Sequence, residues 1–307
     1  MTRRFIEKIT FIIIIILFPL FIIGQGDDYI WVGGTGNWSD ETHWVSANGG
    51  IPGQDDNVFF NASSFTSNNQ TVTIDVEAFC FRMDWSGATN QPILSGSMDI
   101  HIFSSIIFSP LVNVTYYGDI YLDGTGFDQS IQSAGVTLNS NIYFEGMGIW
   151  SLSGDLDVGT KSIYFNNGSL NTLGYMISCG SFYSTTSNSK ALKLDESVIR
   201  IHGLNGVWQV SNNLYFIKDE SVIEFIQNSF VSTNIFDGGG LSYNRVVFRN
   251  SATILGNNSF ENVYLHADCD YVFQGGSTQV IYGGLHARGC AGLIFWRRGF
   301  DDCKDRS

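Results

Sequence analysis

The sequence predicts an all-β protein, in the form of a single-stranded parallel β-helix (β-solenoid) with an N-terminal cap and a preceding signal-peptide helix. Three observations predict this class. After residue 24, no run of apolar residues keeps helical spacing. Short β-branched and aromatic segments instead alternate with Gly, Asn, Ser and Asp, which is typical of strands and turns. Several of these segments are near copies of one another and recur at 17 to 23 residues, as the rungs of a solenoid do.

Residues 1–24 have the order of a secretory signal peptide. A short basic segment precedes an apolar run from Ile9 to Ile23, and small residues follow it. The run is shorter than the roughly 20 residues that a spanning helix needs. We therefore expect cleavage near Gly24 or Gln25, export to the cell surface or the medium, and no spanning helix in the mature chain. An uncleaved membrane anchor is the alternative.

Residues 25–70 are expected to cap the solenoid. The open end of a stack exposes unpaired strand edges and apolar core, so a covering segment is needed. Trp31, Trp38 and Trp44 lie here around Gly33–Gly36, whose glycines allow a tight turn. We expect the three indole rings to be buried over the first rungs. The alternative is an exposed platform on which sugars stack.

Residues 71–285 are predicted to form the solenoid. The segments 119–123, 141–145 and 162–166 share an apolar–Tyr–apolar centre. Side chains alternate along a strand, so the apolar residues beside each tyrosine are expected to point inward. These predicted core residues are Ile120, Leu122, Ile142, Phe144, Ile163 and Phe165. We expect Ile120, Ile142 and Ile163 to lie in consecutive parallel strands, although the irregular spacing leaves a β-sandwich as an alternative.

The tyrosines between these core positions should form an outward aromatic stripe. They are Tyr121, Tyr143 and Tyr164, and they are the candidate ligand-binding residues. Outward Asn, Ser and Thr residues would add many weak polar contacts. Repeated weak sites along a rod gain affinity by multivalency, which is typical of attachment.

The N-terminal motif resembles the start of the large adhesin-like surface proteins of gliding bacteria. The motif reads Trp31-Val-Gly-Gly-x-Gly-Asn-Trp-Ser-Asp-x-x-His-Trp44, then Pro52-Gly-x-Asp-Asp-x-Val-Phe-Phe60. Similar motifs open autotransporter-type β-helical passengers. Further agreement comes from Cys80-x-x-x-Asp-Trp-Ser-Gly87 and Phe236-Asp-Gly-Gly-Gly-Leu241, so the resemblance covers about residues 29–285.

The resemblance implies an adhesin-like surface scaffold of a family exported by the type IX route. Its implied partners are glycans or other cell-surface molecules. Family members are commonly longer and end in immunoglobulin-like modules and a sorting domain. Residues 286–307 match no rung and form an atypical tail, which a truncation or a shifted reading frame would explain.

The charge balance argues against nucleic acid and anionic membranes as partners. The formal net charge is -13, and between residues 25 and 160 the only basic residue is Arg82. Binding to a phosphate backbone needs clustered Lys and Arg, which this half of the chain does not supply.

A β-helical polysaccharide hydrolase or lyase is the alternative function. Glycoside hydrolysis needs two carboxylates at a suitable separation, and the available pairs are Asp55 with Asp56, Asp119 with Asp123, and Asp155 with Asp157. Solvated turn carboxylates are the simpler explanation of these residues, so no catalytic residue and no cofactor are predicted. Asp123 and Asp128 are weak candidates for Ca²⁺ ligands.

The five cysteines are an odd number for an exported chain. Cys269 and Cys290 are 21 residues apart, about one rung, so they are a candidate disulfide. Cys80 and Cys179 are far apart in sequence, and we expect them to be buried and reduced.

Overall fold

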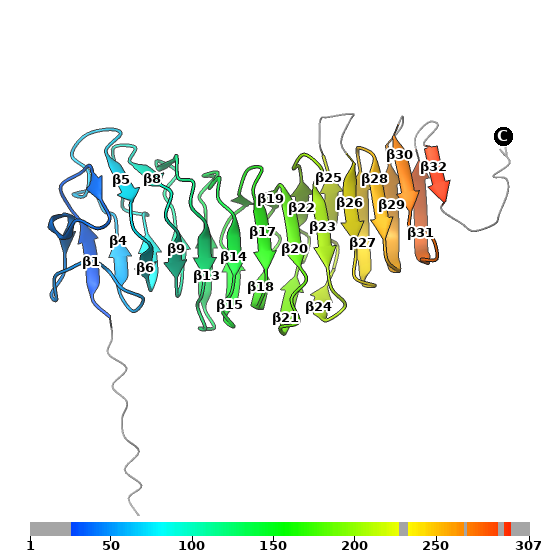
Figure 1. The fold of residues 1–307 in the computed structure, drawn as a ribbon, viewed down its shortest axis with the longest axis horizontal. Coiled ribbons are helices and arrows are strands. Elements are labelled where there is room, and N and C mark those ends of the chain that lie inside the picture. Colours follow the sequence, from blue (N-terminus) through cyan, green and yellow to red (C-terminus); the bar gives the residue numbers. More distant parts are fainter. Residues whose placement is uncertain (1–25, 227–232, 267–268, 288–291, 296–307) are drawn as a thin grey trace, which may run out of the picture.

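The computed structural model describes residues 26–226, 233–266, 269–287 and 292–295. These residues form a rod of stacked coils whose first and last strands lie at opposite ends of the long axis (Figure 1). The segment predicted as signal peptide, residues 1–24, lies outside the described residues. Within the described ranges, no helix has the length and apolar character required to cross a bilayer.

Sheet A runs along one side of the rod and holds ten strands. They are β1 (Asp28–Trp31), β3 (Trp44–Val45), β4 (Asn57–Phe59), β7 (Arg82–Asp84), β10 (Ile106–Ile107), β13 (Gln129–Gln132), β15 (Ile149–Leu152), β18 (Gly168–Asn171), β21 (Lys190–Lys193) and β24 (Leu214–Ile217).

Sheets B and D take the same place in the order of the coil, sheet B early in the chain and sheet D later. Sheet B holds β2 (Gly36–Asn37), β5 (Thr71–Ile74), β8 (Ile93–Gly96) and β11 (Asn113–Val114). Sheet D holds β16 (Leu156–Asp157), β19 (Ile177–Cys179), β22 (Val198–Ile201), β25 (Val222–Phe225), β27 (Ser242–Phe248), β29 (Asn258–Leu265) and β31 (Gln279–Ala287).

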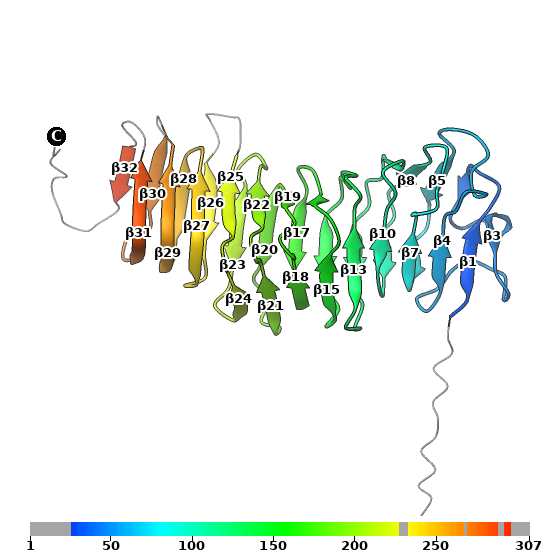
Figure 2. The same ribbon diagram turned by 180° about the vertical axis from the view of Figure 1, so that it is seen from behind.

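Sheet C is the longest, with eleven strands, and runs almost the whole length of the rod (Figure 2). It holds β6 (Ala78–Cys80), β9 (Ile100–Ile102), β12 (Ile120–Leu122), β14 (Ile142–Phe144), β17 (Ser162–Phe165), β20 (Ser181–Ser184), β23 (Val207–Val210), β26 (Asn234–Asp237), β28 (Ala252–Leu255), β30 (Asp270–Phe273) and β32 (Gly292–Phe295).

The strand pairing confirms the predicted solenoid and excludes the sandwich. Ile120 of β12 pairs in parallel with Ile142 of β14, and Ile142 pairs in parallel with Ile163 of β17. All six predicted core residues of these strands are buried. One coil therefore repeats as a strand of sheet A, one of sheet B or D, and one of sheet C, which buries the apolar side chains of each rung against the next.

The number of strands in a coil changes along the rod. No described strand joins sheet A after β24, so the later coils alternate only between sheets D and C. The sheet D strands lengthen in compensation, to 7, 8 and 9 residues in β27, β29 and β31. The step from Val246 to its partner Val263 is 17, whereas that from Ile120 to Ile142 is 22. Connecting loops make other two-strand coils longer, since the step from Ile223 to its partner Val246 is 23.

The N-terminal end is closed by an antiparallel strand. β3 pairs with β1 through Trp31 and Trp44 and forms the outer edge of sheet A. Trp31 and Trp38 are fully buried, and Trp44 is 6% exposed. Both Trp31 and Trp38 meet Trp44 edge-to-face with ring centroids 4.8 Å apart. This cluster covers the apolar end of the stack, as an N-terminal cap must.

The segment 25–70 also contributes to the parallel stack itself. β1 pairs in parallel with β4, and β2 pairs in parallel with β5. The first coil therefore begins at β1. The capping elements are the segment that follows β2, including the short 3₁₀ helix Glu41–His43, and β3.

The glycine-rich turn is shaped around His43. Its imidazole stacks on Trp31 with centroids 4.7 Å apart, and its Nδ1 lies 2.7 Å from the carbonyl oxygen of Val32. A Cβ at Gly36 would lie 2.1 Å from His43 Nε2, and Gly33 has a φ of +80°. The glycines therefore leave room for the ring and permit the left-handed turn beside it.

Replacing His43 with alanine should loosen the cap and spare the rest of the rod. We expect a local loss of about 1–2 kcal/mol, because one ring stack and one hydrogen bond disappear. Solenoid coils interact only with their neighbours, so amide hydrogen exchange should accelerate in β1 to β5 and stay unchanged in β20 to β28. Glu41→Ala, at an exposed position of the same turn, is the matched control. Faster exchange along the whole rod would contradict this picture.

Candidate functional site

Six rings form a continuous stack on the outer surface of sheet C, here called the aromatic ladder. Each ring comes from the middle position of one sheet C strand, and successive rings are nearly parallel, with interplanar angles between 6° and 18°. The centroid distances along the stack are 5.0, 4.6, 4.7, 4.5 and 5.2 Å. The members in order are Phe79, His101, Tyr121, Tyr143, Tyr164 and Tyr183.

The ladder follows from strand alternation and register. In β12, Ile120 and Leu122 are buried, so Tyr121 between them points outward and is half-buried by its neighbours. Parallel pairing without slippage places Tyr121 opposite His101 on one side and Tyr143 on the other. The structure thus brings the three predicted tyrosines together, and it adds three rings that the sequence analysis did not include.

One flank of the ladder is a column of polar residues that links successive coils. The backbone N–H of Asp119 donates to Asp99 Oδ1 (3.0 Å), and Asn141 Nδ2 donates to Asp119 Oδ1 (3.0 Å). The N–H of Ser162 donates to Asn141 Oδ1 (2.9 Å). Each side chain satisfies a group on the next coil, which fixes the spacing of the rungs.

The other flank holds a second set of carboxylates. His101 lies between one carboxylate of each flank, with Nδ1 2.6 Å from Asp123 Oδ2 and Nε2 3.2 Å from Glu77 Oε1, which precedes β6 as Asp99 precedes β9. Further along, Asn166 Nδ2 donates to Glu145 Oε1 (2.6 Å). The ladder is therefore bordered by acidic groups on both sides, which disfavours an anionic ligand.

The environment raises the pKa of two ladder phenols, Tyr121 and Tyr143. Burial raises the pKa of Tyr121, and the carboxylates of Asp99 and Asp119 add to the shift. Burial also raises the pKa of Tyr143, with further contributions from Asp119, to whose carboxylate the Tyr143 hydroxyl donates a hydrogen bond. The hydroxyl groups of Tyr121 and Tyr143 are therefore neutral at neutral pH.

The stacking geometry limits what the ladder can bind. Interior rings cover one another's faces, so they offer their edges and hydroxyls to a partner. A sugar cannot stack on a face that another ring occupies. Hydroxyl groups at the strand spacing of about 4.8 Å instead suit a partner with many hydroxyl or amide groups.

The remaining candidate residues, the three tryptophans and the two weak Ca²⁺ candidates, do not form a binding site. The rings of Trp31, Trp38 and Trp44 are buried in the cap, so these three offer no sugar-stacking platform. Of the weak Ca²⁺ candidates, Asp123 is paired with His101 and Asp128 is exposed in the following loop. No group of three or more His, Cys, Asp or Glu side chains among the described residues is arranged to hold a metal.

The carboxylate pairs considered for hydrolysis have structural partners. Asp56 accepts hydrogen bonds from the N–H groups of Asp27 and Gly53. Asp155 accepts from the N–H of Met176 (2.9 Å) on the next coil. Asp157 accepts from the Thr137 hydroxyl and the N–H of Gly159, both at 2.9 Å. These contacts tie turns and coils together.

Cys80 and Cys179 are buried and free, as expected. Burial raises the pKa of both thiols, which disfavours the reactive thiolate. Cys269 is half-buried, with its Sγ 3.7 Å from the carbonyl oxygen of Arg249. The proposed bridge to Cys290 stays a prediction, because Cys290 lies outside the described residues.

Fold and surface together define a parallel β-solenoid with an outward aromatic ladder. Comparison with known proteins found no matching family model, no matching curated protein and no matching solved structure.

Proposed function

We propose that this protein is an exported, adhesin-like β-helical scaffold that binds glycans or other cell-surface molecules through the aromatic ladder. The observation that carries the proposal is the unbroken row of six rings, three of them the tyrosines that the repeats predicted. The four consecutive tyrosines of this row repeat one hydroxyl group along the rod, so one extended partner can be held at several points and its affinity then grows by multivalency.

The chemistry of the ladder favours a neutral, hydroxyl-rich glycan. Phenol hydroxyls donate and accept hydrogen bonds, and Tyr143, whose proton is bonded to Asp119, offers its lone pairs, whereas the bordering Asp and Glu oxygens accept. Sugar hydroxyls can do both. The acidic borders repel carboxylate- or sulfate-bearing chains from this surface. Export rests on the signal-peptide pattern of residues 1–24, and attachment to a cell surface rests on the resemblance of the N-terminal motif.

The triple substitution Tyr121→Phe, Tyr143→Phe and Tyr164→Phe tests the ladder directly. It removes three hydroxyls and keeps the ring stack, so folding should be preserved while binding to neutral glycans weakens by at least about tenfold. A glycan array with neutral and uronate-bearing saccharides, followed by titration of the neutral hits, measures this. The matched control is Tyr117→Phe with Tyr215→Phe, two tyrosines that are 75% and 68% exposed and lie outside the ladder.

Unchanged glycan binding by the triple variant would remove the ladder as the binding surface. The enzymatic alternative is tested on the same purified protein with a hydrolysis assay. We expect no cleavage, and Asn substitutions at Asp119, Asp123, Asp155 and Asp157 should leave binding largely intact. Cleavage of a polysaccharide by the wild type that is lost in any of these variants would favour the hydrolase or lyase instead.

A further inference from the structure

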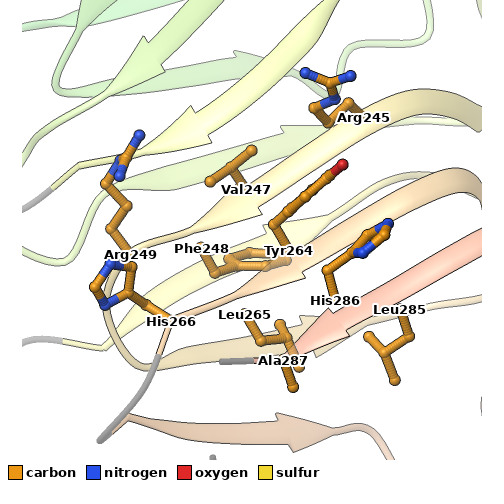
Figure 3. Close-up of a pocket in the computed structure, with 10 residues that line it drawn as sticks. All are labelled: Arg245, Val247, Phe248, Arg249, Tyr264, Leu265, His266, Leu285, His286 and Ala287. Atoms are coloured by element: carbon orange, nitrogen blue, oxygen red, sulfur yellow. The ribbon is translucent and has the colours of Figure 1, made fainter. Parts of the chain in front are cut away.

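A groove of about 620 Å³ lies at the last described strands of sheet D (Figure 3). Its lining combines outward side chains with four residues from the inward-facing positions between them, Phe248, Leu265, Leu285 and Ala287. Arg245, Val247 and Arg249 come from β27 and the residue after it. Tyr264 and His266 come from β29 and its end, and His286 comes from β31. Figure 3 shows Val247 between the two arginines and Tyr264 beside His286.

This groove is basic on an otherwise acidic rod. The chain carries a net charge of -13. Within the described part of the chain there are four arginines, and three of them, Arg200, Arg245 and Arg249, lie on the outer surface of sheet D. His266 and His286 line the same groove. Such a local concentration of guanidinium groups is the usual basis of carboxylate and sulfate recognition.

Arg249 is held in place by a buried carboxylate. Glu224 is 8% exposed, and its Oε1 accepts from Arg249 Nε (2.7 Å) and Nη2 (2.5 Å). Arg200 approaches the other oxygen of Glu224 at 3.5 Å. Two guanidinium groups thus share one carboxylate, so the cluster keeps an excess positive charge. Both arginine side chains stay substantially exposed to solvent.

Arg245 is positioned by an aromatic ring and has no carboxylate partner among the described residues. Its guanidinium carbon lies 5.4 Å from the centroid of the Tyr264 ring, in a cation–π contact. Tyr264 in turn stacks on His286 with centroids 4.3 Å apart. The guanidinium is therefore oriented by a π contact while its N–H donors are not used by an acidic side chain in the described part of the protein.

We infer that this groove binds an acidic saccharide unit, with Arg245 donating hydrogen bonds to its carboxylate or sulfate and Val247 contacting its apolar ring face. Arg245 and Arg249 are four residues apart on one strand, which corresponds to about 13 Å between their Cα atoms. That span matches a short oligosaccharide lying along the strand. The inference rests on the proposed glycan-binding role, but it concerns a different surface and the opposite charge class of ligand.

The charges favour a sugar over a nucleic acid in this groove. A phosphate backbone carries a charge at every residue and needs many basic contacts. Here two arginines stand in a strongly acidic molecule, which repels a densely charged polymer. A short saccharide with only one or a few acidic groups fits the few donors available.

Arg245→Gln is the decisive variant, because it removes the unpaired guanidinium and leaves Glu224 with both of its arginines. Isothermal titration calorimetry is carried out with trigalacturonic acid and, in parallel, with a sulfated trisaccharide. The comparison shows whether the groove prefers a carboxylate or a sulfate group. We expect the wild type to bind at least one of them and Arg245→Gln to bind it about 10- to 100-fold more weakly. Val247→Phe should give a similar loss, since a larger side chain fills the floor of the groove without changing its charge.

Lys161→Gln is the matched control, since it removes one positive charge near β17 and should change the affinity less than about twofold. An equal loss in this control, or no loss in either groove variant, overturns the inference. So does failure of the wild type to bind either acidic sugar, or tighter binding of a single-stranded oligonucleotide. Neutral-glycan binding measured on the same Arg245→Gln protein keeps the two proposals separate, because it reports on the ladder alone.

Discussion

Replacing Trp208 with alanine should lower the free energy of unfolding by about 3–5 kcal/mol, the usual cost of deleting a large buried aromatic side chain. Trp208 lies in β23, is fully buried and stacks on Phe182 of the neighbouring strand with centroids 4.8 Å apart. Its Nε1 donates to the Tyr243 hydroxyl (3.1 Å), which itself donates to the carbonyl oxygen of Gly238 (2.9 Å). The substitution therefore leaves a cavity and removes a buried hydrogen bond at the point where three coils meet.

Chemical denaturation followed by circular dichroism measures the loss, and hydrogen exchange locates it. Exchange should accelerate most in the coils that contain β20, β23 and β26, because each coil is stabilised by its neighbours. Tyr215→Ala is the matched control, since that ring is 68% exposed on β24 and its loss should cost less than about 0.5 kcal/mol. A Trp208→Ala protein as stable as this control would show that the coil interior is not close-packed there.

Gly146→Ala should destabilise the protein by about 2–3 kcal/mol, although it adds a single methyl group. Gly146 follows β14 at a corner where the turns of successive coils stack directly. A Cβ there would lie 2.0 Å from the carbonyl oxygen of Gly124 and 2.4 Å from the carbonyl carbon of Asp123. Both are backbone atoms, so no side-chain rotation relieves the clash, and the spacing between the two coils must open.

Gly154→Ala gives the opposite expectation in the same coil. A Cβ at Gly154 meets no atom within 4 Å, and its φ is not in the left-handed region. This substitution should be neutral or stabilise by up to about 1 kcal/mol, because alanine restricts the unfolded chain. Thermal unfolding of the two variants side by side checks the difference in sign. Equal stability of the two would contradict the stacked-turn geometry.

Some features of this protein were accessible from local sequence patterns. Alternation around Tyr121, Tyr143 and Tyr164 identified which side chains point inward, and the near-identical strand motifs indicated parallel, in-register pairing. This succeeds because a one-residue slip would turn the whole apolar set to solvent, so a strand with one buried face has little freedom of register. The buried tryptophans of the cap followed from the same demand to cover an apolar end.

Other features were decided only by the tertiary structure. His101 joins the aromatic ladder because its strand pairs with that of Tyr121, but its motif, Ile100-His-Ile102, differs from the tyrosine repeats. Two sequence features could have identified His101: it lies between two apolar residues, as the tyrosines do, and it precedes Tyr121 by 20 residues. Both features are found only if histidine is included among the aromatic residues of the repeat. The end of sheet A after β24 had no local signal, and the short step of 17 residues from Val246 to Val263 lies beyond it.

The sequence by itself determined the class of fold, the inward side chains of the clearest rungs and the identity of three ladder residues. These depend on strand alternation and on repeats, which are local properties. The tertiary structure decided which outward residues become neighbours, because Arg245, Tyr264 and His286 are separated by about twenty residues at each step and meet only when the coils stack in register. A surface site in a solenoid is therefore formed by residues from several coils, and no single stretch of sequence contains all of them.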